Sequence, residues 1–282
     1  MSSDHAALAY AVATQVALCT IVGIDGSFSR RCGAQLAVGR DGTLVGDMAD
    51  NCLQNELAAQ ATISAREGII KLLRYGKGSP FIDFRLPCGS GLDILIDPAP
   101  QAHQLSKCVA DLGARRATAL PLAVPAAADR RFLRVRRYIP RLRLLVLGTG
   151  AECKALQRQA EATDVDVELR AAGQQFALNT VPTGISADPW TAVLLLFHDH
   201  EWEHALLAWA LRTPAFYIGC QGGAQARARR LELLRADGFD DAALARINSP
   251  VGLVPRARSP EVLALSILSE VVGAYEALHP HP

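Results

Sequence analysis

The sequence has almost no excess charge, since 29 Lys and Arg residues face 28 Asp and Glu residues for a formal net charge of +1. Such a chain has no bulk field to attract nucleic acid or acidic lipid, so we expect neither as a partner. No apolar run approaches the ~20 residues that a helix needs to span a bilayer, and we expect no membrane segment. The first residues lack a basic stretch followed by an apolar one, so we expect no secretory signal and a cytoplasmic location.

Paired cysteines are also missing, because the seven cysteines are an odd number and include no CxxC pair. In a cytoplasmic protein they are expected to be reduced thiols that act as ligands or nucleophiles rather than as disulfides. Cys52 begins a predicted helix, where the helix N-terminus lowers the pKa of a thiol. Cys88 lies in a glycine-flanked turn. Buried, inert cysteine remains the alternative for each. No Ser/His/Asp arrangement or paired carboxylate motif stands out, so no catalytic residue is predicted.

The first part of the chain, residues 1–125, predicts a small α+β domain. Alanine-rich residues predict an opening helix, and alternating or continuous apolar runs predict strands, two of which form a hairpin around Arg40 and Asp41. The expected helices are 6–18 and 51–73, and the expected strands are 17–23, 35–39, 42–46 and 92–97. Two prolines between residues 119 and 128 favour an edge strand or the approach to a linker, which we place at 126–139.

From residue 140 to 282 the pattern changes to strands that alternate with helices. The expected strands are 142–147, 165–169, 192–197 and 215–219, and the expected helices are 152–161, 202–211, 225–237 and 260–276. Residues 192–197 are apolar throughout, as in the central strand of a parallel sheet. Such alternation predicts a Rossmann-like, doubly wound domain at the C-terminus. The fold class is therefore α/β, with a smaller α+β domain first.

A glycine turn, Gly148-Thr149-Gly150, follows a predicted strand and opens a predicted helix, which is the setting of a dinucleotide fingerprint. The first glycine permits the tight turn, and the second lets the backbone approach a phosphate. Cys153 fills the third glycine position, so the fingerprint is incomplete. Glu168 is expected at the end of the second strand, where an acid binds ribose. Nucleotide binding and a sheet whose crevice has lost or changed its ligand both stay open.

Polar residues also follow the apolar strand, in the run His198-Asp199-His200-Glu201. Open α/β sheets bind ligands at this edge, and His198 is the preferred ligand contact among these residues. His200 and His204 are spaced to share a helical face and chelate a metal, whereas simple polar capping is the alternative. Gly219 begins a second glycine-rich turn whose N–H groups, helped by Arg227, suit an anion or form a plain turn.

Short motifs recur in a fixed order from about Ala17 to Ala277. The first block holds Gly26–Ala34 (GSFSRRCGA), Asp50–Gln54 (DNCLQ) and Leu86–Gly91 (LPCGSG). The second block holds Gly148–Gly150, Glu168–Arg170, His198–Glu201, Ile218–Gly219, Pro250–Leu253 and Ser259–Glu270. In this order the motifs resemble those of the XdhC/CoxI family, the accessory proteins of molybdenum hydroxylases such as xanthine dehydrogenase.

The resemblance implies a cofactor chaperone rather than a catalyst. Such a protein binds the molybdenum cofactor, protects it, contacts a cysteine desulfurase that supplies the terminal sulfido ligand, and delivers the cofactor to a molybdenum hydroxylase apoenzyme. Cys52 and Cys88 carry over as candidate molybdenum contacts, because soft thiolates suit molybdenum. The glycine turns at Gly148, Gly150 and Gly219, with Glu168 and His198, carry over as the crevice. Arg30 and Arg227 suit a pterin phosphate.

The sequence departs from the family pattern at several positions. Asp50 and Asn51 stand where the family has two glycines, and Gln54 stands where it has an acid. Two roles therefore stay open. The chain serves xanthine dehydrogenase itself, or it serves a related molybdenum hydroxylase that uses a dinucleotide form of the cofactor. Two rival interpretations are an NAD(P)-dependent oxidoreductase that uses the Rossmann-like domain and an interaction protein with an empty crevice. A homodimer is expected only from the general frequency of symmetric oligomers.

Overall fold

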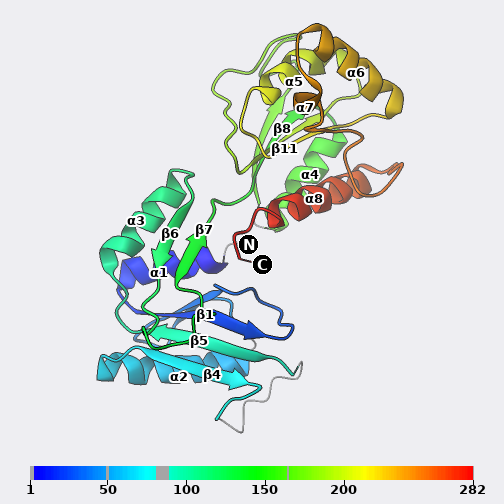
Figure 1. Cartoon of the computed structure of the whole chain (residues 1–282). Helices are drawn as coiled ribbons and strands as arrows, with labels where there is room; N and C mark the ends of the chain where they lie inside the picture. Colours follow the sequence, from blue (N-terminus) through cyan, green and yellow to red (C-terminus); the bar gives the residue numbers. More distant parts are fainter. Residues whose placement is uncertain (1–2, 49–50, 81–88, 164, 282) are drawn as a thin grey trace. The chain divides into compact units, whose positions relative to one another are not determined.

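The computed structural model describes residues 3–48, 51–80, 89–163 and 165–281 (Figure 1). The chain divides into two compact units. The C-terminal unit comprises Arg141–His279, and the N-terminal unit comprises the residues up to Pro140 together with Pro280 and His281. The predicted fold class is confirmed, because a Rossmann-like α/β unit follows an α+β unit. Within the described ranges, no helix is both long and apolar enough to cross a membrane.

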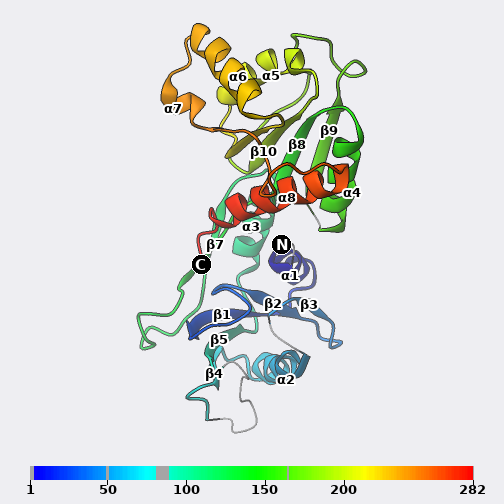
Figure 2. The same ribbon diagram turned by 90° about the vertical axis from the view of Figure 1, so that its right-hand side faces the viewer.

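The N-terminal unit is built on an antiparallel sheet of order β3-β2-β1-β5-β4. Its strands are β1 (Ala17–Asp25), β2 (Gln35–Val38), β3 (Leu44–Gly46), β4 (Lys71–Gly76) and β5 (Gly91–Asp97). Helix α2 (Asn51–Glu67) covers one face of the sheet (Figure 2). The other face is covered by α1 (Ser3–Thr14), α3 (Ala102–Gly113) and the hairpin of β6 (Thr118–Pro121) with β7 (Val135–Tyr138).

Strand β1 shows why this unit folds as three layers. Successive side chains of a strand point to opposite faces, so its continuous apolar run supplies two cores. Cys19 and Ile21 pack into the core beneath α2, whereas Leu18 packs into the core beneath α1 and α3. The predicted β2–β3 hairpin and the strand around Leu92–Asp97 are confirmed by the antiparallel pairing.

The opening helix, expected over residues 6–18, spans Ser3–Thr14 instead. Two further expectations in this unit differ from the structure. The helix expected to reach residue 73 ends at Glu67, because Gly68 adopts a left-handed φ of +67°, and the following residues form β4. The expected linker 126–139 contains β7, which pairs with β6 inside the N-terminal unit. Arg136 is buried there because its guanidinium pairs with Asp4 at 2.7 Å and stacks on the ring of Tyr138.

The last described residue returns to the N-terminal unit. The backbone N–H of Arg137 donates to Nε2 of His281 over 2.9 Å. Burial, assisted by nearby arginines, lowers the pKa of His281 to about 4, so its ring is a neutral acceptor at neutral pH. The chain therefore enters the C-terminal unit after Pro140 and leaves it again after His279.

The C-terminal unit holds a parallel sheet of order β12-β11-β10-β8-β9. Its strands are β8 (Arg143–Gly148), β9 (Asp166–Ala171), β10 (Thr191–Leu196), β11 (Tyr217–Cys220) and β12 (Ile247–Asn248). Its helices are α4 (Ala151–Ala162), the short η1 (His200–Trp202), α5 (Glu203–Leu211), α6 (Ala224–Ala236), α7 (Asp241–Leu244) and α8 (Pro260–Glu276). Numbered from β8, this is the doubly wound order 2-1-3-4-5.

Helices cover both faces of this sheet, as its continuous apolar strands require. Apolar residues of α5, α6 and α7 pack with Leu145, Val193 and Ile218 in one core. Helices α4 and α8 pack against each other on the other side (Figure 2). Helix α8 begins as predicted at Pro260, where the Ser259 hydroxyl accepts a bond from the N–H of Val262 at 3.2 Å. Helix α7 and β12 are too short for periodicity to reveal.

The central position of β10 makes its side chains sensitive to truncation. We expect Leu194→Ala, at a fully buried position, to lower the free energy of unfolding of the C-terminal unit by about 2–5 kcal/mol. Leu265→Ala on α8 is the matched control, since Leu265 is 58% exposed, and we expect a change within about 0.5 kcal/mol. All three tryptophans, Trp190, Trp202 and Trp209, belong to this unit, so denaturation followed by tryptophan fluorescence measures it. Equal effects of the two substitutions would contradict the burial of β10.

Candidate functional site

The strand order of the C-terminal unit fixes where a ligand can bind. The order reverses between β8 and β10, and open α/β sheets bind ligands outside the carboxyl ends of the strands at such a point. Gly148 pairs with Leu196 at the ends of these two strands. A Cβ on Gly148 would collide with the carbonyl oxygen of Leu196, so only glycine fits here. The Gly148–Gly150 turn and the segment after β10 therefore meet at one edge.

His198 lies at this edge and contacts the start of α4. Its Nε2 is 3.4 Å from Oε1 of Glu152, in the first turn of α4. The side chain of His198 is 73% exposed, whereas that of Glu152 is largely buried. Gly150 is the N-cap of α4 with a φ of +114°. The structure thus brings together Gly148, Gly150 and His198, three of the residues singled out from the sequence.

Cys153 occupies the third position of the glycine fingerprint as a packing residue. It is buried in α4 beside Gly148, from which a Cβ would lie 3.1 Å from its Sγ. Burial raises the pKa of Cys153 to about 11, so the group is a neutral thiol at neutral pH. The missing glycine therefore changes how α4 packs on the sheet and adds no thiolate to the edge.

Glu168 does not end its strand. Strand β9 was expected to end at residue 169, but it continues to Ala171, which pairs with Gly148. Glu168 pairs with Leu145, three residues before the pair of Ala171 with Gly148. Its Oε1 forms an ion pair with Nη2 of Arg170 at 2.7 Å. The placement expected for a ribose-binding acid is therefore wrong. This weakens the nicotinamide interpretation.

Gly219 and Arg227 have different settings around the neighbouring strand. Gly219 lies within β11, where a Cβ would be 2.8–2.9 Å from the side chains of Tyr217, Leu194 and Val251, so close packing explains the glycine. Arg227 lies in the first turn of α6 and is partly exposed. Among the described residues its guanidinium has no hydrogen bond or ion pair, which leaves it free to bind an anion.

A buried ion pair beside the edge was not found from the sequence. Glu203 at the start of α5 and Arg230 of α6 have side chains that are 1% and 5% exposed, and they pair through both carboxylate oxygens. His200 joins this pair, whereas His204 contacts Asp237 at 2.9 Å. The two histidines thus serve different partners. The described part of the chain holds no cluster of three His, Cys, Asp or Glu residues that fits a metal ion.

Of the N-terminal candidates, the structure describes Arg30 and the backbone of Cys52. Arg30, in the loop after β1, pairs with Asp47 at 2.5 Å, and Asp47 lies five residues before Cys52. The Nε of Arg30 is buried with no partner among the described residues. The backbone of Cys52 lies in the first turn of α2, as predicted, and its side chain is outside the described part. Cys88 is also outside the described residues.

A charge cluster lies where β1 ends. Arg74 of β4 binds the carboxylates of Asp25 and Asp93, at 2.6 Å for Asp93, and Arg131 approaches the same two carboxylates at 3.2 and 3.4 Å. Burial raises the pKa of Asp93 and Arg74 opposes that rise, whereas hydrogen bonding to Arg74 lowers the pKa of Asp25. The cluster fixes the ends of β1, β4 and β5 relative to one another.

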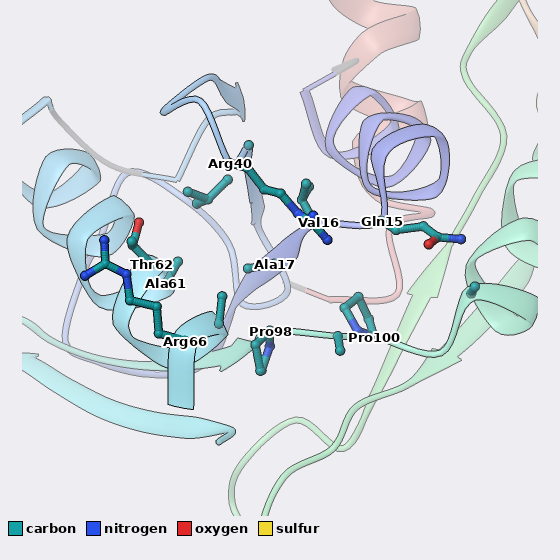
Figure 3. Close-up of a pocket in the computed structure, with 14 residues that line it drawn as sticks. Gln15, Val16, Ala17, Arg40, Ala61, Thr62, Arg66, Pro98 and Pro100 are labelled. Carbon is teal, nitrogen blue, oxygen red and sulfur yellow. The ribbon is translucent and has the colours of Figure 1, made fainter. Parts of the chain in front are cut away.

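A cavity of about 620 Å³ opens at the opposite end of this sheet (Figure 3). Its lining is polar and apolar in about equal parts. Val16, Ala61 and Pro98 contribute apolar surface, and Arg40 and Arg66 reach it from different elements. Its size suits a small ligand. No sequence motif marks it, because its lining comes from four separate segments.

Comparison with known proteins places the chain in a family. A model described as the XdhC Rossmann domain matches residues 144–271, and one described as the XdhC and CoxI family matches residues 9–76. The molybdenum cofactor insertion chaperone PaoD of Escherichia coli (strain K12) is 31% identical over 268 residues, which are 91% of this chain and 82% of PaoD. The chain belongs to the XdhC/CoxI family.

A solved structure shares the fold of this XdhC/CoxI family member. It is a protein from Bacillus halodurans described as a xanthine dehydrogenase, with a TM-score of 0.73 at 19% identity. The match covers 98% of this chain and 97% of that protein. At this identity the likeness concerns the fold alone.

The last family motifs of the chain have a structural explanation. The N–H groups of Gly252 and Val254, in the loop after β12, donate to the Glu270 carboxylate at 2.5 Å and the Ser266 hydroxyl at 2.6 Å. The hydroxyl of Tyr217 donates to the other oxygen of Glu270 at 2.7 Å. Side chains of helix α8 in this XdhC/CoxI member thus hold the loop by hydrogen bonds to the loop's backbone. This contact explains why the motif at Pro250–Leu253 and the motif at Ser259–Glu270 occur together.

The glycine at the end of β8 gives a direct test of the switch-point geometry. We expect Gly148→Ala to lower the free energy of unfolding of the C-terminal unit by about 1–3 kcal/mol, because the added Cβ strikes backbone. Gly223→Ala is the matched control, since a Cβ there meets nothing within 4 Å. Tryptophan fluorescence during denaturation measures both. A neutral Gly148→Ala would show that β8 and β10 do not approach as closely as described.

The charge cluster of the N-terminal unit predicts a pH-dependent defect. We expect Arg74→Met to lower the free energy of unfolding by about 3 kcal/mol at pH 7, because the nearly buried Asp93 loses its closest cation. The pKa of Asp93 then rises further, so the folded state binds a proton more tightly than the unfolded state. The defect must therefore shrink as the pH falls through that raised pKa.

Circular dichroism during denaturation measures this defect, and tryptophan fluorescence serves as the internal control for the other unit. Adding Asp93→Asn to Arg74→Met removes the uncompensated charge and is expected to restore part of the stability. A defect that is independent of pH between pH 4 and pH 8 would exclude Asp93 as its cause.

Proposed function

We propose that this chain is a chaperone that binds the molybdenum cofactor and delivers it to a molybdenum hydroxylase apoenzyme. The observation that carries the proposal is the 31% identity to the molybdenum cofactor insertion chaperone PaoD over 91% of the chain. The family membership supports an accessory role, and the residues around the two sheet edges supply anion-binding groups. The cofactor is cargo in this role.

The described residues fit the phosphate of such a cargo. The N-terminus of α4 presents backbone N–H groups behind a turn where Gly148 leaves no room for a Cβ. The guanidinium of Arg227 has no partner among the described residues. The Nε of Arg30 is buried and also has no hydrogen-bond partner among them. Guanidinium groups bind phosphate through paired hydrogen bonds. We assign Gly148, Gly150 and Arg227 to one contact region and Arg30 to another.

The finer features of the proposal concern the metal and the partners. Cys52 and Cys88 are proposed to contact molybdenum as thiolates, because soft sulfur ligands suit this metal and a helix N-terminus stabilises the thiolate of Cys52. We further propose that a cysteine desulfurase supplies the sulfido ligand while the chain holds the cofactor. The client is a hydroxylase of the xanthine dehydrogenase type or a relative, met in the cytoplasm, and the chaperone acts as a homodimer.

Purification from cells that make molybdopterin tests this proposal. We expect the chain to retain molybdenum and pterin in equal amounts, and Cys52→Ser/Cys88→Ser to lose at least nine-tenths of the molybdenum because the soft ligands are gone. Cys32→Ser, at a partly buried cysteine in the loop after β1, is the matched control. Elemental analysis measures molybdenum, and fluorescence of the oxidised pterin measures the organic part.

Three outcomes separate this proposal from its rivals. Nicotinamide in place of pterin would favour an oxidoreductase, and the absence of both would leave a docking protein. A double variant that keeps wild-type molybdenum would exclude the thiolate contacts while leaving cofactor binding intact. Activation of an apo-hydroxylase by the loaded chain, and not by the chain from cells without molybdopterin, tests delivery.

A further inference from the structure

The buried pair of Glu203 and Arg230 holds a third residue, His200. Nδ1 of His200 lies 3.1 Å from Oε1 of Glu203 and 3.0 Å from Nη2 of Arg230. Arg230 also donates to the Ser249 hydroxyl at 2.8 Å and to the carbonyl oxygen of Gln221. These five residues come from four separate segments at the carboxyl ends of β10, β11 and β12. Because burying an ion pair carries a desolvation cost, the burial of this pair is weak evidence for a gain in stability.

The hydrogens of Arg230 decide the tautomer of His200. Nη2 carries two hydrogens, and Oε1 of Glu203 at 2.9 Å and the carbonyl oxygen of Gln221 accept both. Nη2 has none left for Nδ1 of His200. In the neutral imidazole, Nδ1 is therefore the protonated nitrogen and donates to Glu203. Nε2 then carries the lone pair.

Nε2 of His200 lies against the glycine-rich turn between β11 and α6. A Cβ on Gly222 would be 3.1 Å from Nε2 and 2.8 Å from the neighbouring Cε1, and Gly222 has a φ of +110° that favours glycine. The side chain of His200 is 38% exposed, so the ring reaches solvent at this edge. Within the described ranges Nε2 makes no hydrogen bond. Nε2 of His200 is thus a hydrogen-bond acceptor held beside the turn at Gly222, whose backbone N–H groups are hydrogen-bond donors.

We propose that Nε2 of His200 accepts a hydrogen bond from an N–H or O–H group of the bound ligand, and that Glu203 and Arg230 are the positioning residues that fix its tautomer. The inference rests on the proposed function, because a pterin bears N–H donors and the cofactor phosphate suits the N–H groups of the turns. A carboxylate that orients a histidine through Nδ1 is the arrangement by which proteins aim Nε2 at a ligand. The edge therefore selects a ligand that combines an anionic group with a hydrogen-bond donor.

Two substitutions of His200 separate ligand binding from a structural role. His200→Asn keeps an amide donor near the Nδ1 position but removes Nε2, whereas His200→Gln places an amide near the Nε2 position. Full-length variants are purified from molybdopterin-producing cells, and retained pterin is measured. We expect His200→Asn to retain about tenfold less pterin than wild type with an unchanged unfolding midpoint, and His200→Gln to stay within about threefold of wild type. His204→Asn, at the histidine that pairs with Asp237, is the matched control and retains pterin normally.

The tautomer itself is measured without any ligand. In the full chain labelled with ¹⁵N-histidine, long-range ¹H–¹⁵N correlations at pH 8 distinguish the two ring nitrogens, and the His200 signals are those lost in His200→Asn. We expect a protonated Nδ1 and a bare Nε2. A protonated Nε2, or wild-type pterin retention by His200→Asn, would overturn the inference. If the wild-type chain retains no pterin, both the proposed function and the proposed ligand contact of His200 fail. A bare Nε2 would in that case still confirm that Glu203 and Arg230 position His200.

Discussion

Strands β8 and β10 pair in parallel although β9 lies between them in the chain, and this pairing determines where the C-terminal unit can bind a ligand. The reversal of strand order at that pair opens the sheet edge, because the helices that follow the two strands leave toward opposite faces. Gly148 must approach the backbone of Leu196 for the pair to close. The Gly148–Gly150 turn, His198 and the network around His200 then gather within the same edge.

Much of the fold follows from periodicity, since long elements leave a strong pattern in the sequence. The apolar run of β10 and the capped start of α8 are recovered at nearly their observed bounds. The failures have local causes. Gly68 ends α2 through its backbone conformation while apolar residues continue past it, and β9 runs two residues beyond its apolar core, which moves Glu168 away from the edge.

The site was less predictable than the fold because its charges pair across long stretches of sequence. Helix α6 contains several arginines, and composition alone gives no reason to prefer Arg230 to Arg227. Only the packing of α6 shows that Arg230 faces inward to Glu203 of α5. The position of Glu203, three residues after His200, was the one available signal, since that spacing brings both to one side of a helical turn. The cluster around Arg74 is equally invisible, because its partners Asp25 and Asp93 lie on other strands.

The contact of His281 with the backbone of Arg137 gives the chain an order of assembly. A ribosome releases the N-terminal unit with all its strands long before it makes the residue that completes this contact. Domains fold as units during synthesis, so the N-terminal unit waits with one edge unfinished while the whole C-terminal unit emerges and folds. The contact of His281 with Arg137 forms only after residues 141–279 have been made. A chain truncated before His281 would therefore lose a contact of the unit that is made first, although the missing residues follow the unit that is made second.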